Sequence, residues 1–123
     1  MRILLIDDEE DVRFTTRLAL EQVGGFDVEE ASSGPEGLRL ALERAPDLVL
    51  LDVMMPEMDG PTTLAAFRRE PELARIPVVF LTAKAMPSEI KRLVALGATD
   101  VITKPFEPQE LPARIRAALG RQG

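Results

Sequence analysis

The chain contains no cysteine, no histidine and no tryptophan. Without cysteine it can form no disulfide bond, no thiolate metal site and no cysteine nucleophile. Without histidine it has no imidazole general acid or base, no histidine-ligated zinc and no phosphohistidine of its own. Its chemistry must therefore rest on other side chains.

Long apolar runs and long basic runs are also missing. A helix that spans a bilayer needs about 18 apolar residues. The short apolar start of "MRILLIDDEE" passes into acids, where a signal peptide would need a longer apolar core and a cleavage site. The net charge of −6 disfavours non-specific binding to nucleic acid. We therefore expect no membrane insertion, no direct nucleic-acid contact and a cytoplasmic location.

The 123 residues, 46% of them hydrophobic and 29% charged, fit one globular domain. Segments with a helical spacing of apolar residues alternate with short apolar runs. Strands that alternate with helices predict a parallel sheet with helices on both faces, which is an α/β fold of the doubly wound type. The five apolar runs expected to form strands are residues 3–6, 26–28, 48–51, 78–81 and 101–102.

Cap and breaker residues predict where some of the helices begin. Ser33 or Gly34 is expected to cap the second helix. Pro112 would break a helix interior, so the last helix should either start late, around Glu110 or Leu111, or have a distorted first turn. The positions expected to face the core are Phe14, Leu18, Leu20 and Val23 in the first helix, and Leu38, Ala41 and Leu42 in the second.

Polar side chains lie where several predicted strands end. Asp7 and Asp8 follow the first strand, Asp52 follows the third, Thr82 follows the fourth, and Lys104 lies just beyond the fifth. In an open parallel sheet, the carboxyl ends of the strands line one crevice, and ligands bind there. We therefore expect three carboxylates, one hydroxyl and one ammonium group to converge on one site.

These groups together have a definite chemistry. Oxygen ligands without nitrogen or sulfur select a hard cation, and Mg²⁺ suits two or three carboxylates. A phosphoryl group on one carboxylate is the simplest oxyanion to complete such a site. Taken singly, the acids at 7–10 could complement a helix dipole, Asp52 could begin a turn, Thr82 could be structural and Lys104 could be solvated. Their joint position at the correct strand ends favours the shared site.

Four motifs resemble the receiver domain of two-component response regulators over essentially the whole chain, residues 1–123. They are "LLIDDEEDVR", "PDLVLLDVMMPEMDG", "IPVVFLTA" and "GATDVITKPF", in that order and at similar spacings. The resemblance is to single-domain, chemotaxis-regulator-like receivers. It implies a flavodoxin-like (βα)5 fold, with strand order 2-1-3-4-5 in a three-layer sandwich.

The resemblance also implies roles for the residues at the predicted site. Asp52 would be the phosphoacceptor. Asp7 and Asp8, with Asp52 and the backbone carbonyl of Met54, would hold Mg²⁺. Thr82 matches the hydroxyl that turns toward the phosphoryl group.

Further positions match the family or depart from it. Lys104 matches the lysine that pairs with a phosphoryl oxygen, and the Lys104-Pro105 peptide is expected to be cis. Gly60 would permit the tight turn after Asp59. The family usually has an aromatic residue three positions before its lysine, where this chain has Val101. The switch is then expected to be reduced, or to run through the loop after Thr82 and the "AKAMPSEIKR" segment.

Partners follow from the same resemblance. Because the chain has no histidine, the phosphoryl donor would be a separate histidine kinase or phosphotransfer protein, docking beside the first helix. The fourth helix, fifth strand and fifth helix would form the surface for a downstream target, an output domain or a homodimer. The docking candidates are Arg13, Phe14 and Arg17, and the output candidates are Arg92, Val101 and Arg114.

Three other functions compete with this interpretation. A phosphatase of the haloacid dehalogenase type needs a second acid two residues after its aspartate, where this chain has Met54. The chain is therefore not expected to be an enzyme, beyond phosphorylating and dephosphorylating itself. A flavin-binding module needs a phosphate-cradling loop after the first strand, where this chain has "DDEED". A receiver-like scaffold without phosphorylation usually loses an acid or the lysine.

The sequence leaves open whether the chain is complete or part of a longer regulator. Met54 and Lys84 are expected to affect the phosphoryl lifetime.

Overall fold

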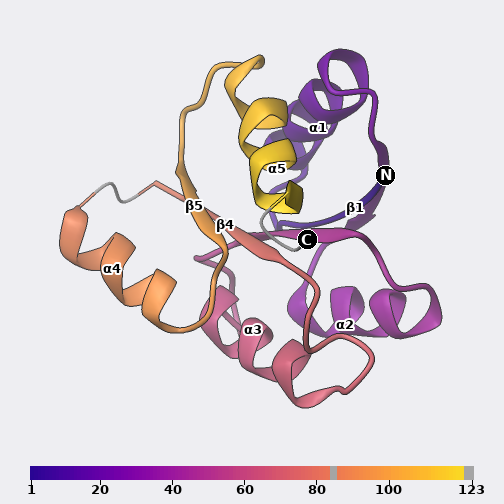
Figure 1. The fold of residues 1–123 in the computed structure, drawn as a ribbon, viewed down its shortest axis with the longest axis vertical. Helices are drawn as coiled ribbons and strands as arrows, with labels where there is room; N and C mark the ends of the chain where they lie inside the picture. Colours follow the sequence, from indigo (N-terminus) through magenta and orange to yellow (C-terminus); the bar gives the residue numbers. More distant parts are fainter. Residues whose placement is uncertain (84–85, 121–123) are drawn as a thin grey trace.

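The computed structural model describes residues 1–83 and 86–120, and the chain alternates between strands and helices throughout (Figure 1). Lys84 and part of the "AKAMPSEIKR" segment lie outside the described residues. The strands are β1 (Arg2–Ile6), β2 (Asp27–Ala31), β3 (Leu48–Asp52), β4 (Val78–Thr82) and β5 (Asp100–Thr103). The helices are α1 (Glu10–Leu18), continued by the π-helical turn η1 (Ala19–Val23), then α2 (Gly34–Glu43), α3 (Gly60–Arg69), α4 (Pro87–Ala95) and α5 (Glu110–Gly120).

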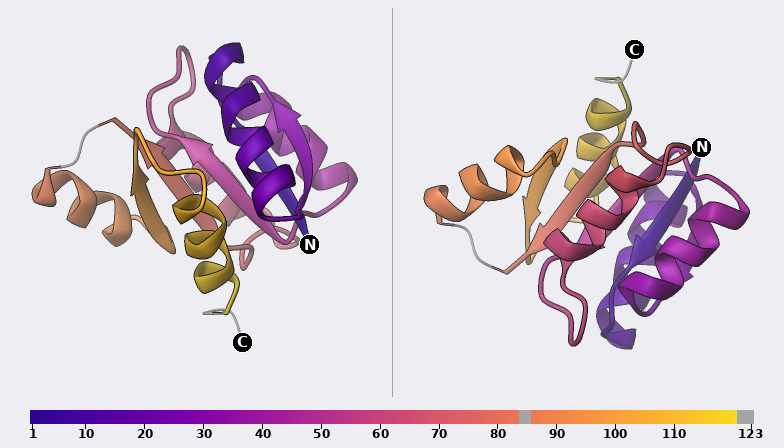
Figure 2. Two further views of the ribbon diagram at one scale, coloured as in Figure 1. Left: turned by 90° about the horizontal axis from the view of Figure 1, so that it is seen from above. Right: turned by 90° about the horizontal axis from the view of Figure 1, so that it is seen from below.

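The five strands form one sheet in the order β2-β1-β3-β4-β5, with every neighbouring pair parallel. The helices α1 and α5 cover one face, while α2, α3 and α4 cover the other (Figures 1 and 2). This arrangement confirms the predicted doubly wound, flavodoxin-like, three-layer fold. The chain order reverses between β1 and β3, so their carboxyl ends flank the crevice where such folds bind ligands.

Two apolar layers hold the sheet between its helices. Every residue of β3 and β4 is buried, as unbroken apolar strands between two helical layers should be. On one face, Leu20 and Ile115 pack with alternate strand residues, and on the other face Phe67 and Leu93 pack with the remaining ones. Because side chains of a strand alternate between its faces, the same strands supply both layers.

Helix caps agree with the sequence at several points. The Ser33 hydroxyl accepts a hydrogen bond from the Glu36 backbone N–H at 3.2 Å, so Ser33 caps α2. Pro112 lies in the first turn of α5, which begins at Glu110 as expected. A proline in the first turn removes only an N–H that has no partner within the helix.

Other expectations were wrong in detail. The second strand is Asp27–Ala31, so Glu29 and Glu30, which the sequence pattern placed after the strand, belong to it. On the first helix, Leu18 is 39% exposed and Val23 is 47% exposed, whereas Leu20 is fully buried; Phe14 is 61% exposed, in agreement with its place among the docking candidates. The π-helical turn explains part of this difference, because it rotates the last turn away from regular 3.6-residue spacing. On the second helix, Leu42 is also exposed.

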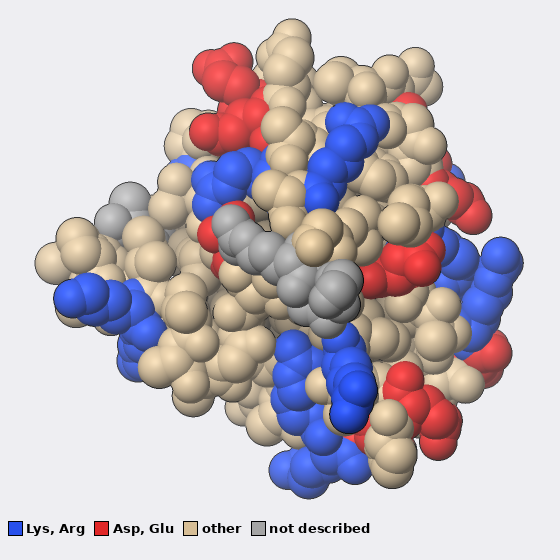
Figure 3. Space-filling view, viewed as in Figure 1, with Lys and Arg blue, Asp and Glu red and all other residues tan. Residues whose placement is uncertain are grey.

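Among the described residues, no helix is long and apolar enough to cross a membrane. On the face seen in Figure 1, basic and acidic side chains are interspersed (Figure 3). Over α4, at the left of that view, basic side chains lie beside uncharged surface.

Candidate functional site

Three carboxylates meet at the carboxyl end of the sheet. Asp7 and Asp8 follow β1, and Asp52 is the last residue of β3, the strand next to β1. One oxygen from each of these side chains lies within 4.8 Å of the other two. The sheet therefore brings together acids that are about 45 positions apart in the sequence, as the strand-end pattern predicted.

The environment of these acids favours a bound cation. Asp7 is fully buried and Asp52 is 3% exposed. Within residues 1–83 and 86–120, Oδ2 of Asp7 and Oδ1 of Asp8 are buried and have no hydrogen-bond partner. Buried carboxylate oxygens without partners cost free energy unless a metal ion or a cation compensates them. A set of oxygen ligands only fits Mg²⁺.

Lys104 supplies part of that compensation. Its ammonium donates a hydrogen bond to Oδ1 of Asp52 at 3.0 Å and lies 3.6 Å from Oδ2 of Asp7. Burial lowers the pKa of Lys104, but the hydrogen bond and charge of Asp52 and the charge of Asp7 outweigh it, so this pKa is raised above its usual value. Lys104 is therefore charged at neutral pH and is aimed at the carboxylates.

Burial also changes the acidity of Asp52. Desolvation, with a smaller contribution from the charges of Asp7 and Asp8, raises its pKa from 3.8 to about 6 against the opposing effect of Lys104. At neutral pH most of the population is still ionised. Asp52 is therefore a carboxylate in a site where negative charge is destabilised, and a bound cation would favour that ionised form.

The ends of β4 and β5 complete the site. Thr82 is 1% exposed and ends β4, beside the end of β3. Its carbonyl accepts a hydrogen bond from the Lys104 backbone N–H at 2.8 Å, which ties the two strand ends together. The structure thus brings together the four charged side chains that the sequence pattern grouped, and it places Thr82 at the end of the adjacent strand.

The loop after β3 depends on a small residue at Gly60. A Cβ atom at this position would lie 2.6 Å from the Asp52 carbonyl oxygen and 2.9 Å from Cα of Val53. Both contacts are shorter than real Cβ atoms tolerate, and they involve backbone that cannot move aside easily. Gly60 therefore lets the start of α3 pack against the peptide of Asp52. The Met54 side chain is 63% exposed in the same loop.

Two expectations from the family resemblance concern the fifth strand. The Lys104-Pro105 peptide is cis, as expected. Val101 is 5% exposed and packs in the layer under α4, so its placement among the surface candidates was wrong.

The other two candidates for the output surface both form ion pairs. Arg114 is paired with Asp100 through two hydrogen bonds of 2.9 Å, and Arg92 is paired with Glu89.

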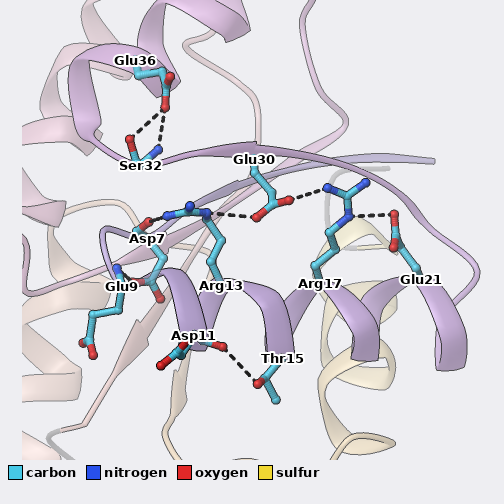
Figure 4. Close-up of polar contacts among 10 residues, drawn as sticks. All are labelled: Asp7, Glu9, Asp11, Arg13, Thr15, Arg17, Glu21, Glu30, Ser32 and Glu36. Carbon is cyan, nitrogen blue, oxygen red and sulfur yellow. Dashed lines mark hydrogen bonds and ion pairs between the residues drawn. The ribbon is translucent and has the colours of Figure 1, made fainter.

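The first helix carries contacts that sequence reasoning missed. Arg13 and Arg17 both form ion pairs with Glu30 of β2 (Figure 4). Arg13 also donates a hydrogen bond to the Asp7 carbonyl at 2.7 Å. These two arginines are therefore held within the molecule, whereas Phe14 on the same helix is exposed. The sequence carries no signal for the pairing of these arginines with Glu30, because the paired residues are far apart along the chain.

Comparison with known proteins decides the family. A family model described as the response regulator receiver domain matches residues 3–116. The chain belongs to this family. As a receiver domain, it is a phosphoacceptor in two-component signalling, and domains of this class are generally not catalytic enzymes.

Relatives and solved structures agree with this assignment. The chain is 41% identical over 120 residues to the DNA-binding dual master transcriptional regulator RpaA of Synechocystis sp., covering 98% of the chain and 49% of RpaA. It is 40% identical over 120 residues to the alkaline phosphatase synthesis transcriptional regulatory protein PhoP of Bacillus subtilis, covering 98% of the chain and 49% of PhoP. The chain thus spans about half the length of these curated relatives.

Two solved receivers have the same fold. The chemotaxis response regulator CheY4 of Vibrio cholerae superposes with a TM-score of 0.88 at 30% identity, covering 95% of this chain and 97% of CheY4. The receiver domain of the Francisella response regulator 1452 superposes with a TM-score of 0.89 at 28% identity, covering 99% of this chain and 98% of that domain.

Proposed function

We propose that residues 1–123 form one receiver domain, in which Asp52 accepts a phosphoryl group from a separate histidine kinase or phosphotransfer protein. Asp7, Asp8, Asp52 and the backbone carbonyl of Met54 would hold the Mg²⁺ that this reaction needs. The observation that carries the proposal is the cluster of three carboxylates within 4.8 Å, two of whose buried oxygens lack hydrogen-bond partners in the described part of the chain.

In the reaction, a carboxylate oxygen of Asp52 attacks the phosphorus atom of the donor phosphohistidine. A P–O bond forms as the P–N bond breaks, and the electron pair of that bond leaves with the imidazole nitrogen of the donor. Mg²⁺, when bound, supplies positive charge that stabilises the phosphoryl oxygens. The pKa of about 6 keeps most of the Asp52 population ionised at neutral pH, as a nucleophile must be.

Lys104 and Thr82 would then hold the product. Lys104 now donates to Oδ1 of Asp52 at 3.0 Å, and the same ammonium can turn to a phosphoryl oxygen once Asp52 is phosphorylated. The Thr82 hydroxyl, at the end of the neighbouring strand, is a second donor. Hydrolysis of the phosphoaspartate returns the carboxylate. The phosphatase alternative lacks its second acid, because Met54 stands two residues after Asp52.

The donor would dock over α1 and the loop between β5 and α5. A cleft of about 500 Å³ lies there, lined mainly by apolar atoms of residues such as Val12, Pro105 and Phe106, and Lys104 forms part of its wall. Phe14 is 61% exposed on the same helix. Since Arg13 and Arg17 are paired with Glu30, Phe14 and the cleft are better docking candidates than the two arginines.

The output surface would be formed by α4, β5 and α5. Met86, Val94 and Leu96 expose apolar side chains in and beside α4, which suits a downstream protein target, an output domain or a homodimer. Because Val101 is buried, the switch would move α4 and the loop before it rather than turn an exposed ring. Relatives that the chain matches along about half of their length are named transcriptional regulators, so an output domain in a longer protein is one such partner. We place the domain in the cytoplasm, without direct contact to nucleic acid.

Incubation with Mg²⁺ and a small acyl phosphate tests this function. Intact mass is expected to show one added phosphoryl group on the wild type, none in the presence of a chelator, and none on Asp52→Asn. Asp59→Asn, which changes an exposed acid seven residues further along, is the matched control and is expected to be labelled like the wild type. A wild type without an adduct, or an Asp52→Asn variant with an equal adduct, would refute the proposal.

A further inference from the structure

The backbone of Asp7, the first of the two adjacent aspartates, is held at both its N–H and its carbonyl. The Asp7 N–H donates to the carbonyl of Ala31 on β2 at 3.1 Å. The Asp7 carbonyl accepts a hydrogen bond from Nη1 of Arg13 on α1 at 2.7 Å (Figure 4). Because a peptide unit is planar, a fixed Asp7 carbonyl also fixes the plane that leads into Asp8. Two of the three carboxylates of the proposed metal site, those of Asp7 and Asp8, therefore extend from backbone that Arg13 helps to orient.

Arg13 is itself held in place. Its Nε donates to Oε1 of Glu30 at 2.9 Å, and only 16% of its side chain is exposed. The other carboxylate oxygen of Glu30 accepts a hydrogen bond from Arg17, whose Nε donates to Glu21 at 3.0 Å. Glu30 thus fixes the Arg13 guanidinium and offsets a positive charge that would otherwise repel a cation beside Asp7.

We propose that Arg13 is a positioning residue for the Mg²⁺ site, acting through the Asp7 carbonyl, with Glu30 holding Arg13 in the required position. This inference rests on the metal site of the proposed function. Arg13 does not touch the reacting atoms. It sets the direction from which Asp7 and Asp8 reach the ion.

Loss of the Arg13 charge and loss of its hydrogen bond to the Asp7 carbonyl should change Mg²⁺ affinity in opposite directions, so an affinity measurement distinguishes the two effects. Removing a positive charge near a cation site raises cation affinity by Coulomb's law. Releasing the Asp7 carbonyl lets the peptide rotate, which lowers affinity because the two carboxylates no longer converge. Residues that orient metal ligands change affinity by roughly 10- to 100-fold. Arg13 acts through the backbone, so we expect the lower end, about tenfold.

Two variants of the full chain make a matched pair for this test. Arg13→Met and Arg17→Met each remove one positive charge and one ion pair with Glu30 from the same helix. Only Arg13→Met also removes the hydrogen bond to Asp7. Mg²⁺ affinity is measured by isothermal titration calorimetry, and circular dichroism in chelator compares the folding of the metal-free variants. We expect binding about tenfold weaker in Arg13→Met, and unchanged or slightly tighter in Arg17→Met.

Equal affinity in the two variants, or wild-type affinity in Arg13→Met, would overturn the inference. If Arg13→Met does not fold, Arg13→Lys takes its place, because lysine keeps the charge but lacks the guanidinium fork that bridges Glu30 and Asp7. Weaker Mg²⁺ binding by Arg13→Lys supports the inference, and wild-type binding overturns it. A wild type that binds no Mg²⁺ would instead refute the metal site of the proposed function, so the two failures are distinguishable.

Discussion

Asp52→Asn is expected to stabilise the metal-free protein at neutral pH. Burial raises the pKa of Asp52 from 3.8 to about 6, so between about pH 4 and pH 6 the folded state binds more protons at this group than the unfolded state does. Stability therefore falls as pH rises through this window. The shift of about two pKa units corresponds to about 3 kcal/mol at pH 7 and above. Asparagine cannot ionise and escapes this cost, while its amide oxygen can still accept the hydrogen bond from Lys104.

Thermal unfolding followed by far-ultraviolet circular dichroism in chelator measures this effect. For a chain of this size, about 3 kcal/mol corresponds to a rise in Tm of roughly 10 °C. The gain should be largest at pH 7–8 and should shrink as pH falls toward 4. Saturating Mg²⁺ should reduce it, because the ion binds the ionised wild type and stabilises the folded state.

A control shows that the effect belongs to the buried site. Hydrogen bonds from Thr62 to Asp59 lower the pKa of Asp59, so ionisation of Asp59 favours folding, and its contribution is lost as pH falls through that lowered pKa. Asparagine is an equally good helix cap. Asp59→Asn should therefore give no gain in Tm at pH 8. An Asp52→Asn variant that is no more stable than the wild type at pH 8, or whose gain does not depend on pH, would refute the reasoning.

Two further substitutions test other parts of the site. Lys104→Met should leave Mg²⁺ binding intact or make it tighter in calorimetry, because the substitution removes a competing cation. It should nevertheless slow labelling by acyl phosphate by at least about tenfold, since a charge-assisted hydrogen bond contributes about 1.5–3 kcal/mol. Unchanged labelling would contradict the role given to Lys104. Gly60→Ala should lower stability by about 1–3 kcal/mol in denaturant unfolding, because its Cβ would overlap the Asp52 and Val53 backbone; wild-type stability would show that the loop relaxes freely.

The fold and the clustering of the three acids with Lys104 could be predicted from the sequence, because both follow from position along strands. Unbroken apolar runs marked β1, β3 and β4, and the polar residue after each run fell at the same edge of a parallel sheet. Asp7, Asp52 and Thr82 were found in this way, although no two of them are close in the sequence. The rule that links them is geometric and holds for any open parallel sheet.

What could not be predicted depends on details of packing. The π-helical turn at Ala19–Val23 changed which side of the first helix is buried, so the exposed Val23 was assigned to the core. Glu30 was placed after its strand, and its pairing with Arg13 was invisible because long-range ion pairs leave no periodic pattern. Val101 was assigned to the surface, because the sequence alone does not show which face of β5 is covered by a helix.

The central claim is that one particular carboxylate, among the three that cluster, accepts the phosphoryl group. The most direct test is to label the wild-type chain with acyl phosphate and Mg²⁺, digest it, and locate the phosphoryl group by tandem mass spectrometry. The account predicts modification at Asp52, with the peptide that contains Asp7 and Asp8 unmodified. A phosphoryl group on Asp7 or Asp8, or on an acid outside the cluster, would contradict it.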